Sequence, residues 1–163
     1  MLDYNTYLNA YLTNKLLPNG TYLQNTTESG FISDLKGNLL ASTPKFKLEK
    51  YKLEIKVDEA NFKEIEIDEI SMLLDLVEKG IINTPMGLSI GKMFYQLESK
   101  DQEKGIFILS KTDGGACIMK TIHSIVFGSY STKIKMTDNQ PQNSEVCNDR
   151  VISLGKLIID NNS

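Results

Sequence analysis

Apolar side chains near the N-terminus recur every three or four residues. The positions are Tyr4, Tyr7, Leu8, Tyr11 and Leu12. This spacing places them on one face of a helix, for which Asp3 is a suitable N-terminal cap. The turn-forming residues 18–20, Pro-Asn-Gly, should end that helix. We therefore predict a first helix with a stripe rich in tyrosine.

Two stretches in the first half of the chain have the features of β-hairpins. In the first, the apolar residues of 30–33 and 38–41 flank the turn residues Lys36-Gly37. In the second, apolar and charged side chains alternate through residues 51–67, on both sides of a turn at 58–61. A period of two with charges at every second position predicts strands with one wet face. We expect the segment 46–67 to be an exposed hairpin arm.

Two later segments have helical spacing. The first begins at the capping residue Asp68 and ends at Gly80. Its apolar stripe consists of Ile70, Leu73, Leu74 and Val77. Near the C-terminus, helical spacing relates Cys147, Val151, Leu154 and Ile158. Each helix is expected to pack its apolar stripe against the rest of the domain.

The most apolar part of the chain lies within residues 114–130. Its runs 116–119 and 125–127 are apolar without alternation, which predicts a hairpin at the centre of a sheet, buried on both faces. Shorter strands are expected at 87–90, 94–97 and 106–109, and the polar segment 131–144 should be a flexible loop. Helices at both ends with strands between them predict one α+β domain over residues 1–163. In this domain the terminal helices share one face of a central antiparallel sheet, and the smaller middle helix covers the other.

The composition narrows the range of functions. The chain has 163 residues, of which 40% are hydrophobic and 24% charged, and its formal net charge is -3. These values are ordinary for a globular protein and give no overall basic charge for binding nucleic acid. No apolar run approaches the ~20 residues of a membrane span, and the N-terminus lacks the pattern of a signal peptide. We expect a cytoplasmic protein with two reduced cysteines, Cys117 and Cys147.

Several motifs, in register along the chain, resemble those of profilins, the small proteins that bind actin monomers. Residues 111–130 resemble the family's Lys-x-x-Gly-Gly…Lys-Thr block and the Val-Phe-Gly-x-Tyr strand after it. Residues 3–7 resemble its N-terminal Trp-x-x-Tyr start, and residues 36–42 its Asp-Gly-Ser-Val-Trp-Ala-Ser hairpin. Residues 87–95 follow its Gly-Leu-x-Leu-Gly…Tyr strand, and residues 147–155 are similar to the last helix of plant profilins.

The long hairpin adds a narrower resemblance. Residues 51–67 are similar to the β-hairpin arm of apicomplexan-type protist profilins. This resemblance implies a divergent protist member of the family, apicomplexan or ciliate-like, with a profilin-like fold that carries an extra hairpin.

The resemblance implies an actin-binding surface on the later strands and the start of the last helix. By position, the contacts map to Met86, Gly87, Phe94, Gln96, Lys100, Lys111, Asn148 and Asp149. Lysines would steer the encounter with acidic actin, and Phe94 would add an apolar anchor. The residues alone favour a plainer interpretation, in which Lys100, Lys104 and Lys111 are solvated surface charges. With the resemblance, contact is favoured for Lys111 and Asn148.

The resemblance also implies a groove for proline-rich ligands. Aromatic rings suit a polyproline II helix because they stack on its prolines while their polar groups bond its free carbonyls. Tyr4 and Tyr7 match the family positions, but Leu40 replaces a tryptophan, and the chain has no Trp. Simple packing of the first helix onto its neighbour through Tyr4, Tyr7 and Tyr11 is at least as good an interpretation. We expect weak or absent binding of formin proline-rich segments. Phosphoinositides are a further partner class of the family, for which the sequence has no dense basic cluster.

The sequence predicts no catalytic, metal or cofactor site. His123, the only histidine, lies in a predicted turn, and no cluster of histidine, cysteine and aspartate has metal spacing. Cys117 is expected to be a small core residue, and the opposing hypothesis, a thiol enzyme built on Cys117 and His123, would require a reactive thiolate. Gly114-Gly115 lacks the spacing of a phosphate-binding loop.

The function implied by the resemblance is therefore binding. The chain is expected to sequester actin monomers and to regulate filament assembly. The alternative is a scaffold domain with a related three-layer fold that binds a protein other than actin.

Overall fold

A seven-stranded antiparallel sheet forms the centre of the structure, a computed structural model that describes residues 3–161. The strands, in order across the sheet, are β4 (Leu39–Ser42), β3 (Ser29–Asp34), β11 (Ser124–Ser131), β10 (Gly114–Lys120), β9 (Ile106–Lys111), β8 (Met93–Asp101) and β7 (Leu88–Ile90). Every neighbouring pair is antiparallel. The predicted α+β architecture is confirmed.

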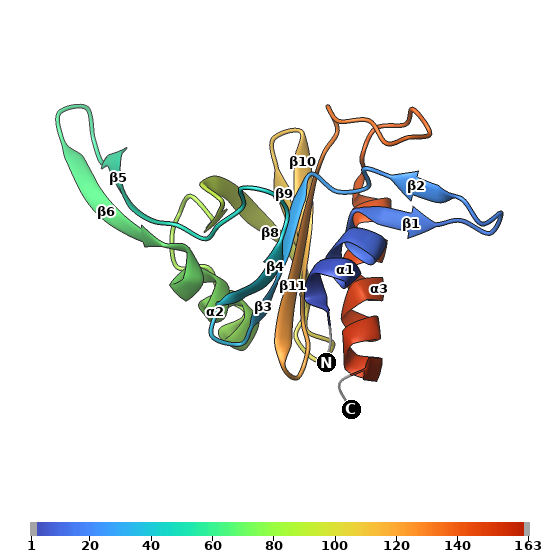
Figure 1. Ribbon diagram of the computed structural model, residues 1–163. Helices are drawn as coiled ribbons and strands as arrows, with labels where there is room; N and C mark the ends of the chain where they lie inside the picture. The colour runs from blue at the N-terminus through green and yellow to red at the C-terminus, as the bar shows by residue number, and fades with distance from the viewer. Residues whose placement is uncertain (1–2, 162–163) are drawn as a thin grey trace.

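Helices cover both faces of this sheet (Figure 1). On one face, α3 (Ser144–Asn161) lies beside the N-terminal helical segment, which consists of α1 (Tyr4–Tyr7) and η1 (Leu8–Leu12). On the other face lies α2 (Glu69–Lys79). The predicted placement of the terminal helices together, opposite the middle helix, is therefore confirmed. No helix within residues 3–161 is long and apolar enough to cross a membrane.

The hairpin of β10 and β11 lies at the centre of the sheet because it is apolar on both faces. Ile118 and Phe127 belong to the core under α2, whereas Cys117 and Val126 belong to the core under α3. All four side chains are 0% exposed. The ring of Phe127 stacks on that of Phe31 with centroids 5.1 Å apart. The prediction of a central hairpin buried on both sides is confirmed.

The first helix is shorter than predicted, and the expectation that it ends near residues 18–20 is wrong. It ends at Leu12 in a π turn, whose last bond runs from the Thr13 amide to the carbonyl five residues earlier. The hydroxyls of Thr13 and Thr26 donate to two more helix carbonyls, so the helix end is satisfied without a further turn. The chain then forms a small hairpin of β1 (Asn14–Leu16) and β2 (Tyr22–Gln24). The turn residues 18–20 connect these two strands.

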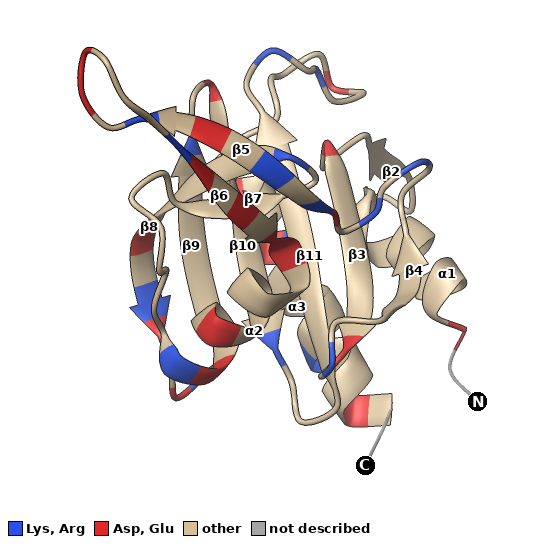
Figure 2. Ribbon diagram, turned by 90° about the vertical axis from the view of Figure 1, so that its left-hand side faces the viewer, with Lys and Arg blue, Asp and Glu red and all other residues tan. Residues whose placement is uncertain are grey.

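A separate two-stranded hairpin, hereafter the arm, projects from the body of the molecule (Figure 1). It consists of β5 (Lys50–Lys56) and β6 (Phe62–Asp68). Figure 2 shows bands of lysine and glutamate along both strands, as the alternation predicts. Two ion pairs cross between the strands, Lys50–Glu66 at 3.2 Å and Lys52–Glu64 at 3.5 Å.

The segment between β11 and α3 is a loop that packs beside the N-terminal hairpin. The buried amide of Gln142 accepts a hydrogen bond from the Ser131 amide and donates one to the Asn25 carbonyl. Met136 in the middle of the loop is also buried. The loop is therefore anchored along its length, and the flexibility expected for residues 131–144 stays a prediction.

Candidate functional site

The residues that the sequence suggests for actin contact come from the segment before β7, from β8 and β9, and from the start of α3. Side chains alternate along a strand, and Tyr95 of β8 faces the core under α2. Phe94 and Gln96, its neighbours, therefore face the side of α3. Beyond a register shift in β8, Lys100 pairs with Phe107 of the α2 core and lies on the opposite side. The suggested set is divided by the sheet.

Four members of the set gather where β7 and β8 meet. The side-chain amide of Gln96 donates to the Met86 carbonyl at 2.8 Å. Between them, Gly87 has a φ of 101°, and a Cβ at this position would clash with the Tyr95 carbonyl. Phe94, which pairs with residue 89 of β7, extends the same strand toward the β7–β8 turn. We name Met86, Gly87, Phe94 and Gln96 the edge cluster.

Lys111 is enclosed by other side chains. It ends β9 on the α2 side, and its side chain is 5% exposed. Its ammonium group pairs with the Glu28 carboxylate and lies 5.4 Å from the centroid of the Tyr95 ring. Ser129 donates a further hydrogen bond to Glu28 at 3.3 Å. Lys111 is therefore not the solvated surface charge that its residue type alone suggests, and contact with actin would require its ammonium to leave Glu28.

Lys100 has a local partner as well. Its ammonium donates to the carbonyl of Gly80 at 3.0 Å. Gly80 is the left-handed residue that ends α2, with a φ of 70°, so Lys100 neutralises part of the negative end of that helix. The side chain is exposed, unlike that of Lys111.

At the start of α3, Asn148 and Asp149 face different surroundings. Burial acts to raise the pKa of Asp149, but the hydrogen bonds and charge of Arg150, with a smaller effect of Lys15, outweigh it and hold the pKa below its usual range. Arg150 also donates to the Tyr11 carbonyl, which ties the N-terminal segment to α3. The side-chain oxygen of Asn148 is buried and has no hydrogen-bond partner within the described residues. Asn148 thus keeps an unused acceptor at the position suggested for contact.

Tyr4, Tyr7 and Leu40, suggested for proline-rich ligands, lie where α1 packs against β4. Tyr4 and Tyr7 are half-buried against the core under α3. The Tyr7 ring is edge-on to that of Tyr11, with centroids 6.0 Å apart. Leu40 is 39% exposed and brings no hydrogen-bond donor. The region is apolar and partly exposed, but two of its aromatic rings are used in packing.

Glu69, the most enclosed carboxylate of the structure's described part, was not among the residues that the sequence suggested. Its side chain is fully buried and accepts hydrogen bonds from the Glu49, Gly91 and Lys92 amides and from the Ser89 hydroxyl, at 2.6 to 3.0 Å. Four donors satisfy a buried carboxylate, so Glu69 joins the base of the arm to the β7–β8 turn.

A sequence signal for Glu69 did exist. The buried residues of α2 are Glu69, Leu73, Leu76 and Val77, which share one helix face. The predicted stripe of Ile70, Leu73, Leu74 and Val77 is rotated from the observed one. It included Ile70 and Leu74, which are only half-buried, in place of the fully buried Glu69 and Leu76. The caps of this helix are as predicted, since Asp68 accepts from the Ser71 amide and Gly80 ends the helix.

Both cysteines are buried, and burial disfavours their thiolate forms. Burial raises the pKa of the Cys117 thiol to about 12, and it also raises that of Cys147. His123 is exposed in the turn between β10 and β11. Among residues 3–161, no group of three or more histidine, cysteine, aspartate or glutamate side chains could hold a metal ion.

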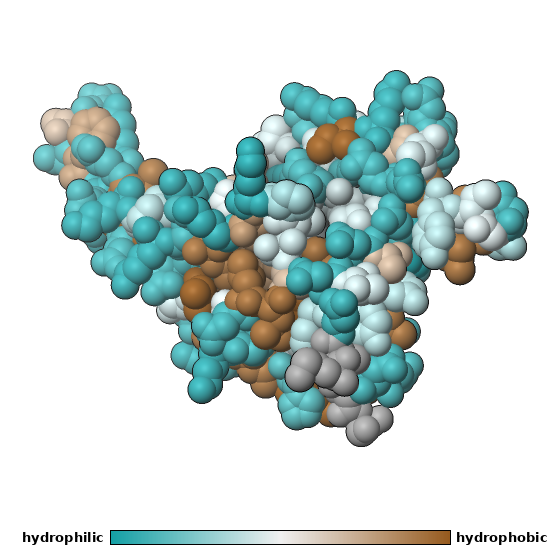
Figure 3. All heavy atoms as spheres, viewed as in Figure 1, coloured by the Kyte–Doolittle hydropathy of each residue, from teal (hydrophilic) through white to brown (hydrophobic). Residues whose placement is uncertain are grey.

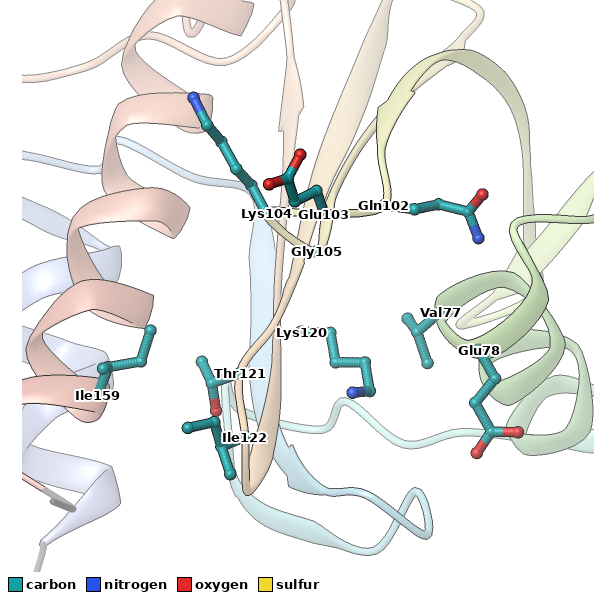
Figure 4. Close-up of a pocket in the computed structure, with 10 residues that line it drawn as sticks. All are labelled: Val77, Glu78, Gln102, Glu103, Lys104, Gly105, Lys120, Thr121, Ile122 and Ile159. Carbon is teal, nitrogen blue, oxygen red and sulfur yellow. The ribbon is translucent and has the colours of Figure 1, made fainter.

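A surface cleft of about 640 Å³ lies between α2 and α3, at the β8–β9 and β10–β11 turns (Figure 4). Two lysines, Lys104 and Lys120, and two glutamates, Glu78 and Glu103, line it with balanced charge. Figure 4 shows Lys120 pointing toward α2 and Ile159 approaching from α3. None of the residues suggested for actin or proline-rich ligands lines this cleft.

Comparisons with known proteins agree with this geometry. The profilin family model matches residues 7–163. Among solved structures, profilin IA of Acanthamoeba castellanii superposes with a TM-score of 0.66 at 16% identity, over 99% of this chain and 100% of that one. Profilin II of the same organism gives 0.66 at 15% identity, and the profilin of Schizosaccharomyces pombe gives 0.61 at 11%, with the same coverage. A comparison with curated protein sequences finds no match.

Proposed function

The chain belongs to the profilin family, and on that basis we propose that it binds one actin monomer, limits spontaneous nucleation and regulates filament assembly. The family is non-enzymatic and generally binds actin monomers. The match over residues 7–163 is the observation that carries the proposal, because it includes every strand and helix around the suggested surface.

The proposed actin-binding surface consists of the edge cluster together with Asn148 and Asp149. Phe94 and Gln96 lie on the α3 side of the sheet, and Asn148 and Asp149 lie on α3 itself. Phe94 supplies an apolar anchor and its strand neighbour Gln96 a polar group, whereas Asn148 and Asp149 supply polar groups from α3. Lys100 and Lys111 belong to the other side and act at the margin of the surface, Lys111 only after separation from Glu28.

The proposal gives proline-rich ligands a minor role. Tyr4 and Tyr7 are engaged in packing, and Leu40 offers no donor for the carbonyls of a polyproline II helix. We therefore expect formin proline-rich segments to bind weakly or not at all, so that the protein acts as a monomer buffer in the cytoplasm. No dense basic cluster supports phosphoinositide binding. The arm supports descent from a protist member of the family.

Assembly of pyrene-labelled actin tests the proposal. The protein should lengthen the lag phase and slow spontaneous assembly in proportion to its concentration. Addition of a formin should restore little of the assembly rate if the groove for proline-rich ligands is degenerate. Unchanged assembly kinetics at a large molar excess of the protein would refute actin sequestration and favour a scaffold that binds another protein.

A further inference from the structure

One edge of the arm has backbone groups that no strand uses. The Glu69 amide donates to the Glu49 carbonyl, and the Val57 amide donates to the Asn61 carbonyl. Hydrogen-bonded and non-hydrogen-bonded pairs alternate along antiparallel strands, so the odd-numbered residues of β5 bond to β6. The amides and carbonyls of the even-numbered residues point away from β6. No other strand within residues 3–161 pairs with this edge.

The arm also has only two strands. A two-stranded hairpin is only marginally stable alone in water, and three or more strands with an apolar face are needed for independent stability. Leu53, Ile55 and Ile65 form a half-buried apolar face on the arm. At its tip, Val57 and Phe62 are 61% and 60% exposed, and Figure 3 shows apolar atoms there, far from the body. Further strands would use the open edge and extend this apolar face, so that its side chains contact those of the added strands.

One charged side chain on the open edge, Glu54, has no ion-pair partner within the described residues. Glu54 lies directly opposite Glu64 in the arm, so two like charges face each other. Lys52 pairs with Glu64, but no ion pair of Glu54 exists within the described residues. Glu54 is exposed and lies two positions from Lys52 on the same edge. A cation supplied from outside the chain would complete the pairing.

From these observations we propose that the arm binds a second copy of this chain by antiparallel pairing of β5 with β5. A two-fold axis at Leu53 places Lys52 of each copy opposite Glu54 of the other, so the missing cation is supplied twice. On the other face, Tyr51 meets Ile55 of the second copy, and the two Leu53 side chains meet at the axis. The result is one sheet of four strands. It has the three or more strands that an independently stable sheet needs, which a single arm does not have.

Other pairings of the arm are less favourable. A two-fold axis at Glu54 sets the two Glu54 side chains against each other and Lys52 against Lys56. An axis at Lys52 also offers Glu54 a lysine, Lys50, but it sets the two Lys52 side chains against each other and leaves Ile55 opposite Glu49 on the apolar face. The open edge of β6 carries Glu64, Glu66 and Asp68, so it repels a second copy of itself. In the proposed register, Lys50 meets Lys56 of the second copy at each end, where exposure weakens the repulsion and Glu66 already pairs with Lys50. The β5 edge is thus the self-complementary one.

Sedimentation velocity over a wide range of protein concentration tests the proposal. The weight-average sedimentation coefficient of the full chain should rise with concentration and level off at the value of a dimer. Glu54→Lys should weaken the association by about tenfold or more, because two attractive contacts become repulsive. The same substitution puts a positive charge opposite Glu64, so it improves pairing within the arm, and a loss of association cannot be ascribed to unfolding of the arm.

Two further variants complete the design. Glu59→Lys makes the same change of charge in the turn of the arm, away from the edge, and should leave the association unchanged. The double variant Lys52→Glu with Glu54→Lys reverses both charges and should restore it. A sedimentation coefficient independent of concentration would overturn the proposal. So would equal losses in the Glu54 and Glu59 variants, or growth beyond a dimer, which would indicate pairing of β5 with β6.

Discussion

Two hairpins of this chain, β10–β11 and the arm, have strands of seven or eight residues but opposite surroundings. The first is buried on both faces by helices, whereas the second projects into solvent with one charged face (Figure 1). Their sequences differ accordingly, since one has continuous apolar runs and the other a strict alternation of charged and apolar residues. The difference shows that burial, and not strand formation as such, sets the apolar content of a hairpin.

The same comparison shows where the stability of the fold originates. Phe127 and its neighbours fill two cores, so their loss leaves cavities. The cross-strand ion pairs of the arm are exposed, and such pairs contribute little. Between these extremes lies Glu69, a buried carboxylate that joins the arm to the body.

The largest effect on stability is expected in the central hairpin. Phe127→Ala should lower the free energy of unfolding by about 3–5 kcal/mol, because the ring is fully buried and stacks on Phe31. Phe62→Ala, at the exposed tip of the arm, should change it by no more than about 0.5 kcal/mol. Urea denaturation of both variants measures the difference. Equal losses would mean that the two hairpins are buried to the same extent.

Thiol reactivity provides a second contrast. Because burial raises the pKa of Cys117 to about 12, its thiolate fraction near pH 8 is about a thousandfold below that of a free thiol. Iodoacetamide should label native Cys117 and Cys147 slowly, and Val57→Cys at the arm tip rapidly. The raised pKa stabilises the fold fully below the unfolded thiol pKa of about 8.5, and this contribution is lost as pH rises toward about 12. Rapid labelling of native Cys117 would instead support a thiol enzyme.

The base of the arm should show an intermediate effect. Glu69→Gln replaces one carboxylate oxygen by a donor that faces other donors, so we expect a loss of about 1–3 kcal/mol in the free energy of unfolding. Glu66→Gln, on the exposed face of the same arm, is the matched control. Hydrogen exchange of the Glu49 and Lys92 amides should accelerate in the first variant and not in the second. Unchanged exchange would contradict the role assigned to Glu69.

The smallest effect is expected for an ion pair of the arm. Lys50 and Glu66 are 67% and 55% exposed, so their interaction is screened by solvent. Lys50→Ala should alter the free energy of unfolding by less than about 0.5 kcal/mol. Thermal unfolding of the wild type and the variant at low and high salt measures the contribution of this ion pair. A loss comparable to that of Glu69→Gln would show that the charged face of the arm matters for folding.

Local periodicity was enough to predict most of the fold. The two cores follow from apolar runs and helical stripes, and the arm follows from alternation around the turn at 58–61. The first helix was overestimated because its end depends on hydroxyls from Thr13 and Thr26, the latter far beyond the helix. The small β1–β2 hairpin was missed for a different reason: its strands are only three residues long, too short for an alternating pattern to be recognised.

The candidate site was less accessible to sequence reasoning. Position along a strand does not reveal on which face a residue lies once a register shift intervenes, as it does between Gln96 and Lys100. Residue type likewise suggested an exposed Lys111, whereas Glu28, 83 positions away, encloses its ammonium. Such pairings depend on tertiary contacts. They leave no local pattern in the chain.

Equilibrium binding to labelled actin monomers, followed by sedimentation velocity, tests the central proposal most directly. We expect saturation at one protein per actin. Phe94→Ala should weaken binding by about tenfold, whereas Lys120→Ala, in the cleft between α2 and α3, should leave it unchanged. If the actin boundary does not shift at a large excess of the wild-type protein, the chain does not bind actin monomers and the proposed function is wrong.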